Sequence, residues 1–222
     1  MRRVGAMKRG LRWRPKEDEL ALVLPNERYP DLEEVRRLSL SPKQRAVVFV
    51  RDLPRPRILS EGEHKLPKNA RQVVLVSTGR KNSPFGVQKR TVFEQLGFSG
   101  MLILRIEDRP DDVERFVEKL VLEQRIMTLG ELVQWLVRNY LIRAFKDIVA
   151  AEGVSEEEFV RAGEELAEKV RDVVNSYIME YGLYLENISV LWPSPRGSSN
   201  TCKTIGHGFL MTIPQRTGRY HS

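Results

Sequence analysis

The spacing of apolar residues changes at Pro110, and this change constrains the fold more than any other feature of the sequence. Before Pro110 the apolar runs are short and turn-forming residues interrupt them often, which is typical of a sheet. After it, apolar residues recur every three or four positions for roughly 70 residues, which is the period of an α-helix. The sequence therefore predicts an α+β fold: a β-rich N-terminal half with a mixed or antiparallel twisted sheet, then three helices and a returning C-terminal strand.

The N-terminal half predicts short strands at 19–24, 46–51, 57–60, 73–77, 87–93 and 100–107. The second and fourth of these contain continuous apolar runs rich in β-branched residues, which predicts burial on both faces. Proline, glycine and asparagine mark turns at 52–56, 61–63 and 81–86.

The first two helices are predicted from their capping residues. A short helix is expected just after Pro110, with Asp111 or Asp112 as its N-cap. Thr128 and Glu131 then form the spacing of a capping box, in which each residue bonds the other's backbone N–H. This box predicts the start of a second helix of about six turns, whose apolar stripe continues to position 149.

The third helix has the same signal at its start. Ser155 and Glu158 repeat the capping-box spacing, and Gly182 stands where a left-handed C-cap ends a helix. The segment 183–191 then predicts the returning strand, which prolines 193 and 195 end.

Positive charge is concentrated at the two ends of the chain, whose formal net charge is +7. The first 16 residues contain no acid and seven basic side chains: Arg2, Arg3, Lys8, Arg9, Arg12, Arg14 and Lys16. The segment 196–222 is also basic, and the body between the two ends is mildly acidic. We interpret the N-terminal segment as an arm that contacts an anionic membrane surface, with RNA as the less favoured alternative. A solvated terminus without a partner is the third interpretation.

These patterns divide the chain into three parts. A flexible basic arm is expected over 1–16, a folded domain over 17–192 and a basic irregular tail over 193–222. The domain itself divides into a β-rich subdomain over 17–108 and a helical, mixed αβ subdomain over 109–192.

The expected location is cytoplasmic and peripheral to the membrane. No apolar run approaches the ~20 residues that span a bilayer, and no signal-peptide pattern opens the chain. The lone Cys202 excludes an intrachain disulfide and a cysteine-based zinc cluster, and fits a reducing compartment. In the arm, Val4, Met7, Leu11 and Trp13 are spaced so that a helix formed at the membrane would present a narrow apolar face.

The sequence contains no recognisable reaction centre. Segment 197–204 nearly matches a phosphate-binding P-loop, but Cys202 replaces its second glycine and no helix follows. The histidines, His64, His207 and His221, lack the spacing of metal ligands.

The acidic pairs at 107–108 and 111–112 stand at a strand-to-helix junction, where capping and helix-dipole effects account for carboxylates. We therefore predict a protein that is not an enzyme and has no catalytic residue, metal, cofactor or small-molecule substrate. Trp135, which lies beside the apolar stripe of the second helix, is predicted to be a core residue or an interface anchor.

Three segments resemble the SPFH, or band 7, superfamily, which includes stomatins, prohibitins and flotillins. The segments are 44–52 (QRAVVFVRD), 58–67 (ILSEGEHKLP) and 100–108 (GMLILRIED, followed by Phe116). The first two are similar to a strand, turn and strand of the family, and the third to its junction from sheet to helix. The upstream segments 12–15 and 20–25 are similar to the opening of a soluble, virion-core-like subgroup.

The resemblance implies an α/β domain that self-associates and organises membrane or protein assemblies, without enzymatic residues. The chain departs from the family in lacking the usual N-terminal membrane hairpin and the long coiled coil, and one cysteine cannot form the zinc ribbon of the subgroup. The expected function is a non-enzymatic scaffold or adaptor that forms a homo-oligomer, with protein partners unidentified. The alternatives are an RNA-associated adaptor that uses the basic ends and an enzyme built around 197–204. The high charge content with few Asn, Gln and Cys fits a thermophilic source.

Overall fold

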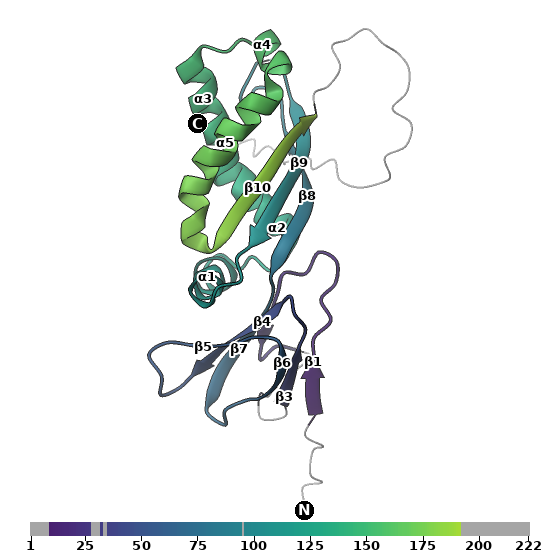
Figure 1. Cartoon of the computed structure of the whole chain (residues 1–222), viewed down its shortest axis with the longest axis vertical. Helices are drawn as coiled ribbons and strands as arrows, with labels where there is room; N and C mark the ends of the chain where they lie inside the picture. The colour runs from purple at the N-terminus through teal and green to yellow at the C-terminus, as the bar shows by residue number, and fades with distance from the viewer. Residues whose placement is uncertain (1–8, 28–31, 33–34, 95, 192–222) are drawn as a thin grey trace, which may run out of the picture.

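The structure is a computed structural model that describes residues 9–27, 32, 35–94 and 96–191. It has an α+β fold, as predicted, and is elongated (Figure 1). One end, here called the β region, holds the strands up to Ser77, and the other end, here called the α/β region, holds the helices and strands from Gly79 to Leu191. The predicted tail and the segment 197–204 lie outside the described residues.

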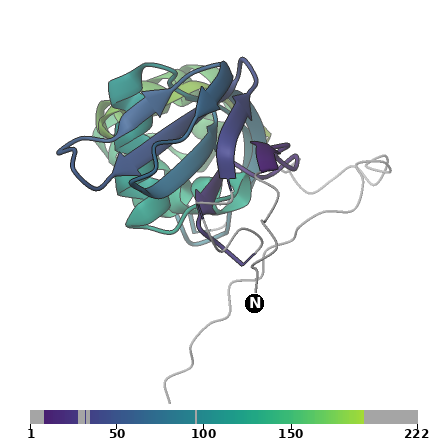
Figure 2. The same ribbon diagram turned by 90° about the horizontal axis from the view of Figure 1, so that it is seen from below.

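The β region consists of two sheets. Its strands are β1 (Arg9–Arg12), β2 (Ala21–Leu24), β3 (Val35–Leu40), β4 (Gln44–Val50), β5 (Arg57–Leu59), β6 (Gly62–Lys65) and β7 (Ala70–Ser77). The larger sheet has the order β2-β7-β4-β5 and the smaller one the order β1-β3-β6. All pairs are antiparallel except β1 with β3, which are parallel. Figure 2 shows the molecule from the end at which the β region lies.

The larger sheet is buried on both faces, which confirms the prediction from its continuous apolar runs. On β7, Val73 and Leu75 belong to the core shared with the smaller sheet. Val74 and Val76, which alternate with them, belong to the core shared with the helices. All four are fully buried. Because successive side chains of a strand point to opposite faces, only a sheet covered twice can hold an unbroken apolar run.

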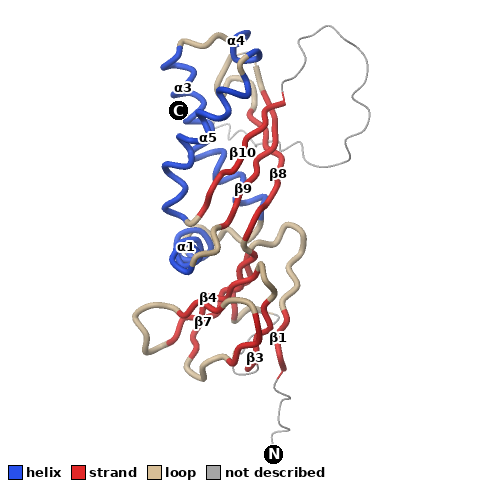
Figure 3. The backbone as a smooth tube through the Cα atoms, in the orientation of Figure 1, coloured by secondary structure: helices blue, strands red, loops and turns tan. Residues whose placement is uncertain are grey.

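The α/β region is a sheet with helices on one face. Its antiparallel strands, in the order β10-β9-β8, are β8 (Gly79–Val87), β9 (Phe98–Ile106) and β10 (Leu183–Leu191). The helices are α1 (Pro110–Phe116), α2 (Leu129–Leu136), α3 (Ile142–Glu152), α4 (Glu156–Arg161) and α5 (Gly163–Ile178). Two π-helical segments, η1 (Val117–Leu122) and η2 (Val137–Leu141), and a 3₁₀ turn, η3 (Met179–Tyr181), complete it. Figure 3 shows the helices gathered on one side of the three strands.

Two strand predictions are wrong around β8. The segment 81–86 was expected to be a turn and 87–93 a strand, but β8 covers the whole of the first and ends at Val87. The turn-forming residues Pro84 and Gly86 are exposed and alternate with buried Phe85 and Val87. Because β8 lies at the edge of its sheet, a proline can stand there without the loss of a hydrogen bond between strands. Strands β1, β3 and β6 were not predicted, whereas β10 has the predicted bounds.

The helix starts are partly as predicted. Both capping boxes, at Thr128–Glu131 and Ser155–Glu158, are present. The N-cap of α1 is Arg109, which makes no side-chain cap, so the two aspartates predicted as caps stand in the first turn instead. The predicted third helix is interrupted at Ala162 and forms α4 and α5. It ends as predicted at Gly182, whose φ is 71°.

The regions separate at Thr78 and not at the sheet-to-helix change near 108, because β8 and β9 pair with β10. The arm prediction also needs correction for residues 9–16. Leu11 and Trp13 are buried between the two sheets of the β region, so they cannot form the apolar face of a membrane-bound helix. Residues 1–8 lie outside the described chain. Within the described chain, no helix has the length and apolar character to cross a bilayer.

Candidate functional site

The basic residues predicted to contact an anionic surface are only partly within the described chain. Arg12, Arg14 and Lys16 are exposed and alternate with buried Leu11 and Trp13, so all three stand on the solvent side of their segment. The backbone of residue 9 begins β1. The other predicted members, residues 2, 3 and 8, lie outside the description.

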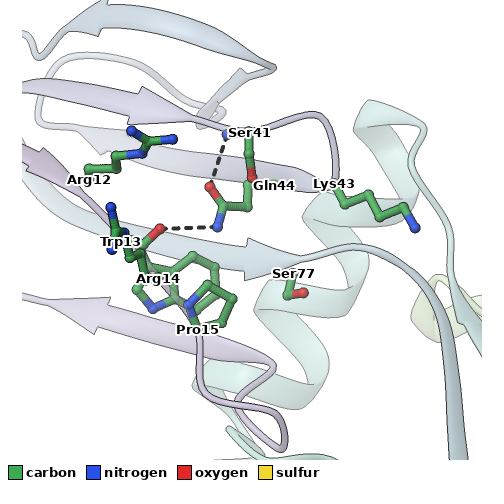
Figure 4. A pocket seen from close by; sticks show the side chains of 8 residues that line it. All are labelled: Arg12, Trp13, Arg14, Pro15, Ser41, Lys43, Gln44 and Ser77. Carbon is green, nitrogen blue, oxygen red and sulfur yellow. Dashed lines mark hydrogen bonds between the residues drawn. The ribbon is translucent and has the colours of Figure 1, made fainter.

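Next to these residues the β region holds a pocket of about 310 Å³, here called the basic pocket. It forms where the chain leaves β1, beside the turn between β3 and β4 and the end of β7 (Figure 4). Its lining residues are Arg12, Trp13, Arg14, Pro15, Ser41, Lys43, Gln44 and Ser77. Three of the eight are cations and none is an acid.

Gln44 holds the two sides of the basic pocket together. Its side-chain oxygen accepts a hydrogen bond from the backbone N–H of Ser41 at 3.0 Å, and its side-chain nitrogen donates to the backbone oxygen of Trp13 at 3.2 Å (Figure 4). The Trp13 indole is buried and donates to a Glu19 carboxylate oxygen at 3.3 Å. A buried amide satisfied in this way fixes the position of the groups it joins.

The charge of the basic pocket is not neutralised by the described chain. Arg12, Arg14 and Lys43 form no ion pair with any described residue, although Arg45 close by binds Asp108 at 2.5 Å. Behind the pocket, Lys81 donates to the Ser77 hydroxyl at 2.7 Å. Burial, and then the charge of Lys43, lower the pKa of Lys81 below its ordinary value. The effect of Lys43 on Lys81 indicates a positive potential at this position.

A second feature is a group of aromatic rings on the α/β region, here called the aromatic cluster: Trp135, Tyr140, Tyr177 and Tyr181. The ring centroid of Trp135 lies 5.1 Å from that of Tyr140 and 5.0 Å from that of Tyr181. Tyr140 stacks on Tyr177 at 5.8 Å and hydrogen-bonds the Tyr181 hydroxyl at 2.9 Å. The cluster joins α2, η2, α5 and η3.

The aromatic cluster is only partly covered. Tyr177 is 47% exposed, and the neighbouring Met179 is 56% exposed. Lys119 lies over the Tyr181 ring at 5.1 Å and binds Glu180 at 3.2 Å, so charges of both signs flank the rings. Trp135 is partly buried, which places it at the border between the core and the surface.

The acidic residues and the histidine that the sequence analysis considered as catalytic or metal-binding candidates make contacts within the fold. Glu107 binds Arg105 at 2.7 Å, and Asp112 contacts Arg115. His64 lies on the edge strand β6 and donates to the backbone oxygen of Ser60 at 2.8 Å. The described residues contain no group of three or more His, Cys, Asp or Glu side chains that could hold a metal ion. Residues 202, 207 and 221 lie outside them.

Sequence reasoning did not identify Lys43, Gln44 or Ser77 as site residues. They stand about 30 and 60 positions from Arg12 and reach it only because β1 pairs with β3 and β4 with β7. The sequence held one signal that could have pointed to this site, which is Gln44, a polar residue at the start of a buried strand. The chain matches no protein-family model, and no curated protein matches it.

Proposed function

We propose that this protein is a non-enzymatic scaffold or adaptor domain that associates with copies of itself. The observation that carries the proposal is the aromatic cluster, four contacting rings of which Tyr177 is nearly half exposed, beside an exposed Met179. Aromatic residues and methionine are enriched in the cores of protein interfaces, and large aromatic side chains carry much of the binding energy there. A surface of this kind supports a function in protein association.

The charges around the aromatic cluster favour a second copy as the partner. A two-fold interface brings the same surface of both subunits together, so that surface must be complementary to itself. Lys119 and Glu180 supply both signs beside the rings, and both are partly exposed. Each can face its opposite charge on the other copy, although the chain as a whole is positive. A strongly acidic or basic partner would find no matching patch here.

The resemblance to the SPFH superfamily supports the same proposal. Segments 44–52 and 100–108 form β4 with the turn after it and most of β9 with the turn that leads to α1. The resemblance implies a strand in the first of these segments and a junction from sheet to helix in the second. Self-association is a property of that family, and we extend it to this chain as part of the proposal.

Light scattering on the purified protein at several concentrations tests the proposal. We expect the mass to rise with concentration, and Tyr177→Arg to shift the protein toward the monomer because it places a charge in the interface. Leu53→Arg is the matched control: Leu53 is a large apolar residue with 39% exposure in the β region, and its substitution is expected to change nothing. Circular dichroism checks that both variants fold.

Two outcomes would contradict the proposal. A strict monomer at every concentration removes self-association altogether. Association that survives Tyr177→Arg but is lost in Met101→Arg moves the interface to the exposed face of the β10-β9-β8 sheet, where Met101 lies 36% exposed.

A further inference from the structure

The basic pocket brings together cations that are far apart in the sequence. In Figure 4, Arg12 and Arg14 lie on one side of Gln44 and Lys43 on the other. A folded chain gains nothing from placing like charges around one concave site, because their repulsion destabilises it. We propose that the basic pocket is a binding site for a single phosphate group, carried by free phosphate or by a lipid headgroup.

The pocket also offers hydrogen-bond donors that the fold leaves available. The buried Ser77 hydroxyl accepts its bond from Lys81, so its own O–H can donate to a ligand. Gln44 uses one of its two amide hydrogens on the Trp13 backbone, and the second remains. Together with the guanidinium groups, these donors suit a ligand that has several acceptor oxygens.

Phosphate fits this set of donors better than other anions do. Arginine binds phosphate through two parallel N–H···O bonds, and a phosphate monoester carries close to two negative charges at neutral pH. Arg12, Arg14 and Lys43 carry three positive charges, of which a phosphate monoester neutralises close to two and a carboxylate only one. The volume of about 310 Å³ is that of a small-ligand site. Trp13 and Pro15 give it a partly apolar wall for the group that carries the phosphate.

The surroundings favour one phosphate group over the backbone of a nucleic acid. Single-stranded RNA is bound along a continuous basic groove with aromatic rings for its bases. Beyond Lys43 the next cation, Arg45, already binds Asp108, and the Trp13 ring is buried and held by Glu19. Arg45 therefore does not extend the basic pocket as an unpaired cation, and the buried Trp13 ring is not available to stack on a base.

A bound anion would also change the protonation of Lys81. The pKa of Lys81 is lowered by burial and by Lys43, and a negative charge near Ser77 favours the protonated amine. Phosphate binding is therefore expected to be accompanied by proton uptake at alkaline pH and to raise the melting temperature of the full chain.

Isothermal titration calorimetry of the full chain with inorganic phosphate is the first test. We expect saturable binding that weakens about tenfold in Arg14→Ala and in Ser77→Ala, because each loses a charged or buried hydrogen bond. Arg71→Ala removes an exposed arginine of β7 outside the pocket and is the matched control, with no expected change. A phosphate affinity that is absent, or equal in the wild type and Arg14→Ala, overturns the proposal.

Vesicle sedimentation separates the two sources of phosphate. The probe is an equimolar mixture of phosphatidylcholine and phosphatidic acid, and phosphatidylcholine alone is the control. Binding to the mixed vesicles that inorganic phosphate competes away, and that Arg14→Ala weakens, assigns the site to a lipid headgroup. Calorimetric binding without vesicle binding assigns it to free phosphate.

Binding to a single-stranded RNA that inorganic phosphate does not displace, in the absence of calorimetric binding, overturns the proposal in favour of a nucleic-acid surface. None of these results depends on whether the chain self-associates.

Discussion

The two main sheets of this molecule are built from similar strands but are covered differently. The larger sheet of the β region is packed on both faces, by the smaller sheet and by the helices. The sheet of the α/β region is packed by helices on one face only. On β9, Leu102 and Leu104 are fully buried, whereas Met101 and Ile103, which alternate with them, are not. Coverage, more than strand propensity, therefore decides which residues a strand can carry.

The open face of the α/β sheet is stabilised by charges. Arg105 binds Glu107 at 2.7 Å and Glu186 at 3.3 Å, and it lies over the Tyr184 ring at 5.2 Å. Arg80 on the neighbouring strand binds Glu186 at 3.1 Å. Opposite charges and aromatic pairs across strands each contribute only about 0.2–1 kcal/mol, so this face depends far less on packing than the covered face does.

The largest expected effects come from truncating one side chain on each kind of face. Leu75→Ala in the β region and Leu104→Ala in the α/β region both remove fully buried groups, and each should lower the free energy of unfolding by about 2–5 kcal/mol. Ile103→Ala, on the open face, should lower it by less than about 1 kcal/mol. Denaturation in urea measures all three.

The equivalent test on the other face of the larger sheet is Val74→Ala. If coverage explains the difference between the sheets, this variant is clearly destabilised, whereas the open face of the α/β region's sheet tolerates Ile103→Ala. An Ile103→Ala effect as large as that of Leu104→Ala would mean that something covers the open face, and the comparison would fail.

A somewhat smaller effect is expected at Gly100, where β9 passes between its neighbours. A Cβ there would meet the backbone oxygen of Ser189 and the Phe85 ring, and a backbone atom cannot move aside as a side chain can. Gly100→Ala should cost about 3 kcal/mol, at the upper end of overpacking effects. Gly86→Ala, in the adjacent strand, meets no atom within 4 Å and should be close to neutral. Equal stability of the two variants in urea would refute this account.

The sequence predicted those parts of the fold whose signals are local. The capping boxes at Thr128 and Ser155 and the C-cap at Gly182 depend on a few neighbouring residues, and all three are present. Burial of the larger sheet on both faces was also predictable, because an unbroken apolar run allows no other arrangement. β8 was missed because Pro84 and Gly86 belong to turns in most contexts and to a strand only at a sheet edge.

The candidate sites were less predictable than the fold. Trp135 was selected as a core residue or interface anchor, but its contacts with Tyr140 and Tyr181 depend on how α5 and η3 return to α2. The basic pocket combines residues from β1, the β3–β4 turn and β7, and no spacing in the sequence indicates that they meet. Such proximity is a property of sheet order, which single-sequence patterns do not contain.

The smallest expected effect concerns the joint between the two regions. The start of β2 is attached to the segment before α2, since the backbone N–H groups of Leu20 and Ala21 both donate to the Met127 oxygen, at 2.8 and 3.1 Å. That segment is held by Glu131, whose carboxylate accepts from the backbone N–H groups of Met127 and Thr128, each at 2.9 Å. The capping box therefore acts on the contact between the regions as well as on the helix.

Glu131→Ala is expected to cost about 1 kcal/mol at neutral pH, because it removes the carboxylate that satisfies two backbone donors. Those bonds, that of Met127 first, lower the pKa of Glu131 below its ordinary value of 4.5. A folded-state pKa below the unfolded one gives stability that is fully present above the unfolded pKa and is lost as the pH falls through the folded one. The difference in the free energy of unfolding between wild type and variant, measured in urea, should therefore stay constant near neutrality. It should disappear below about pH 4.5. Glu164→Ala, at an exposed position in the first turn of α5, is the control and should show a smaller difference. A difference that does not change with pH would mean that the carboxylate of Glu131 does not hold the joint.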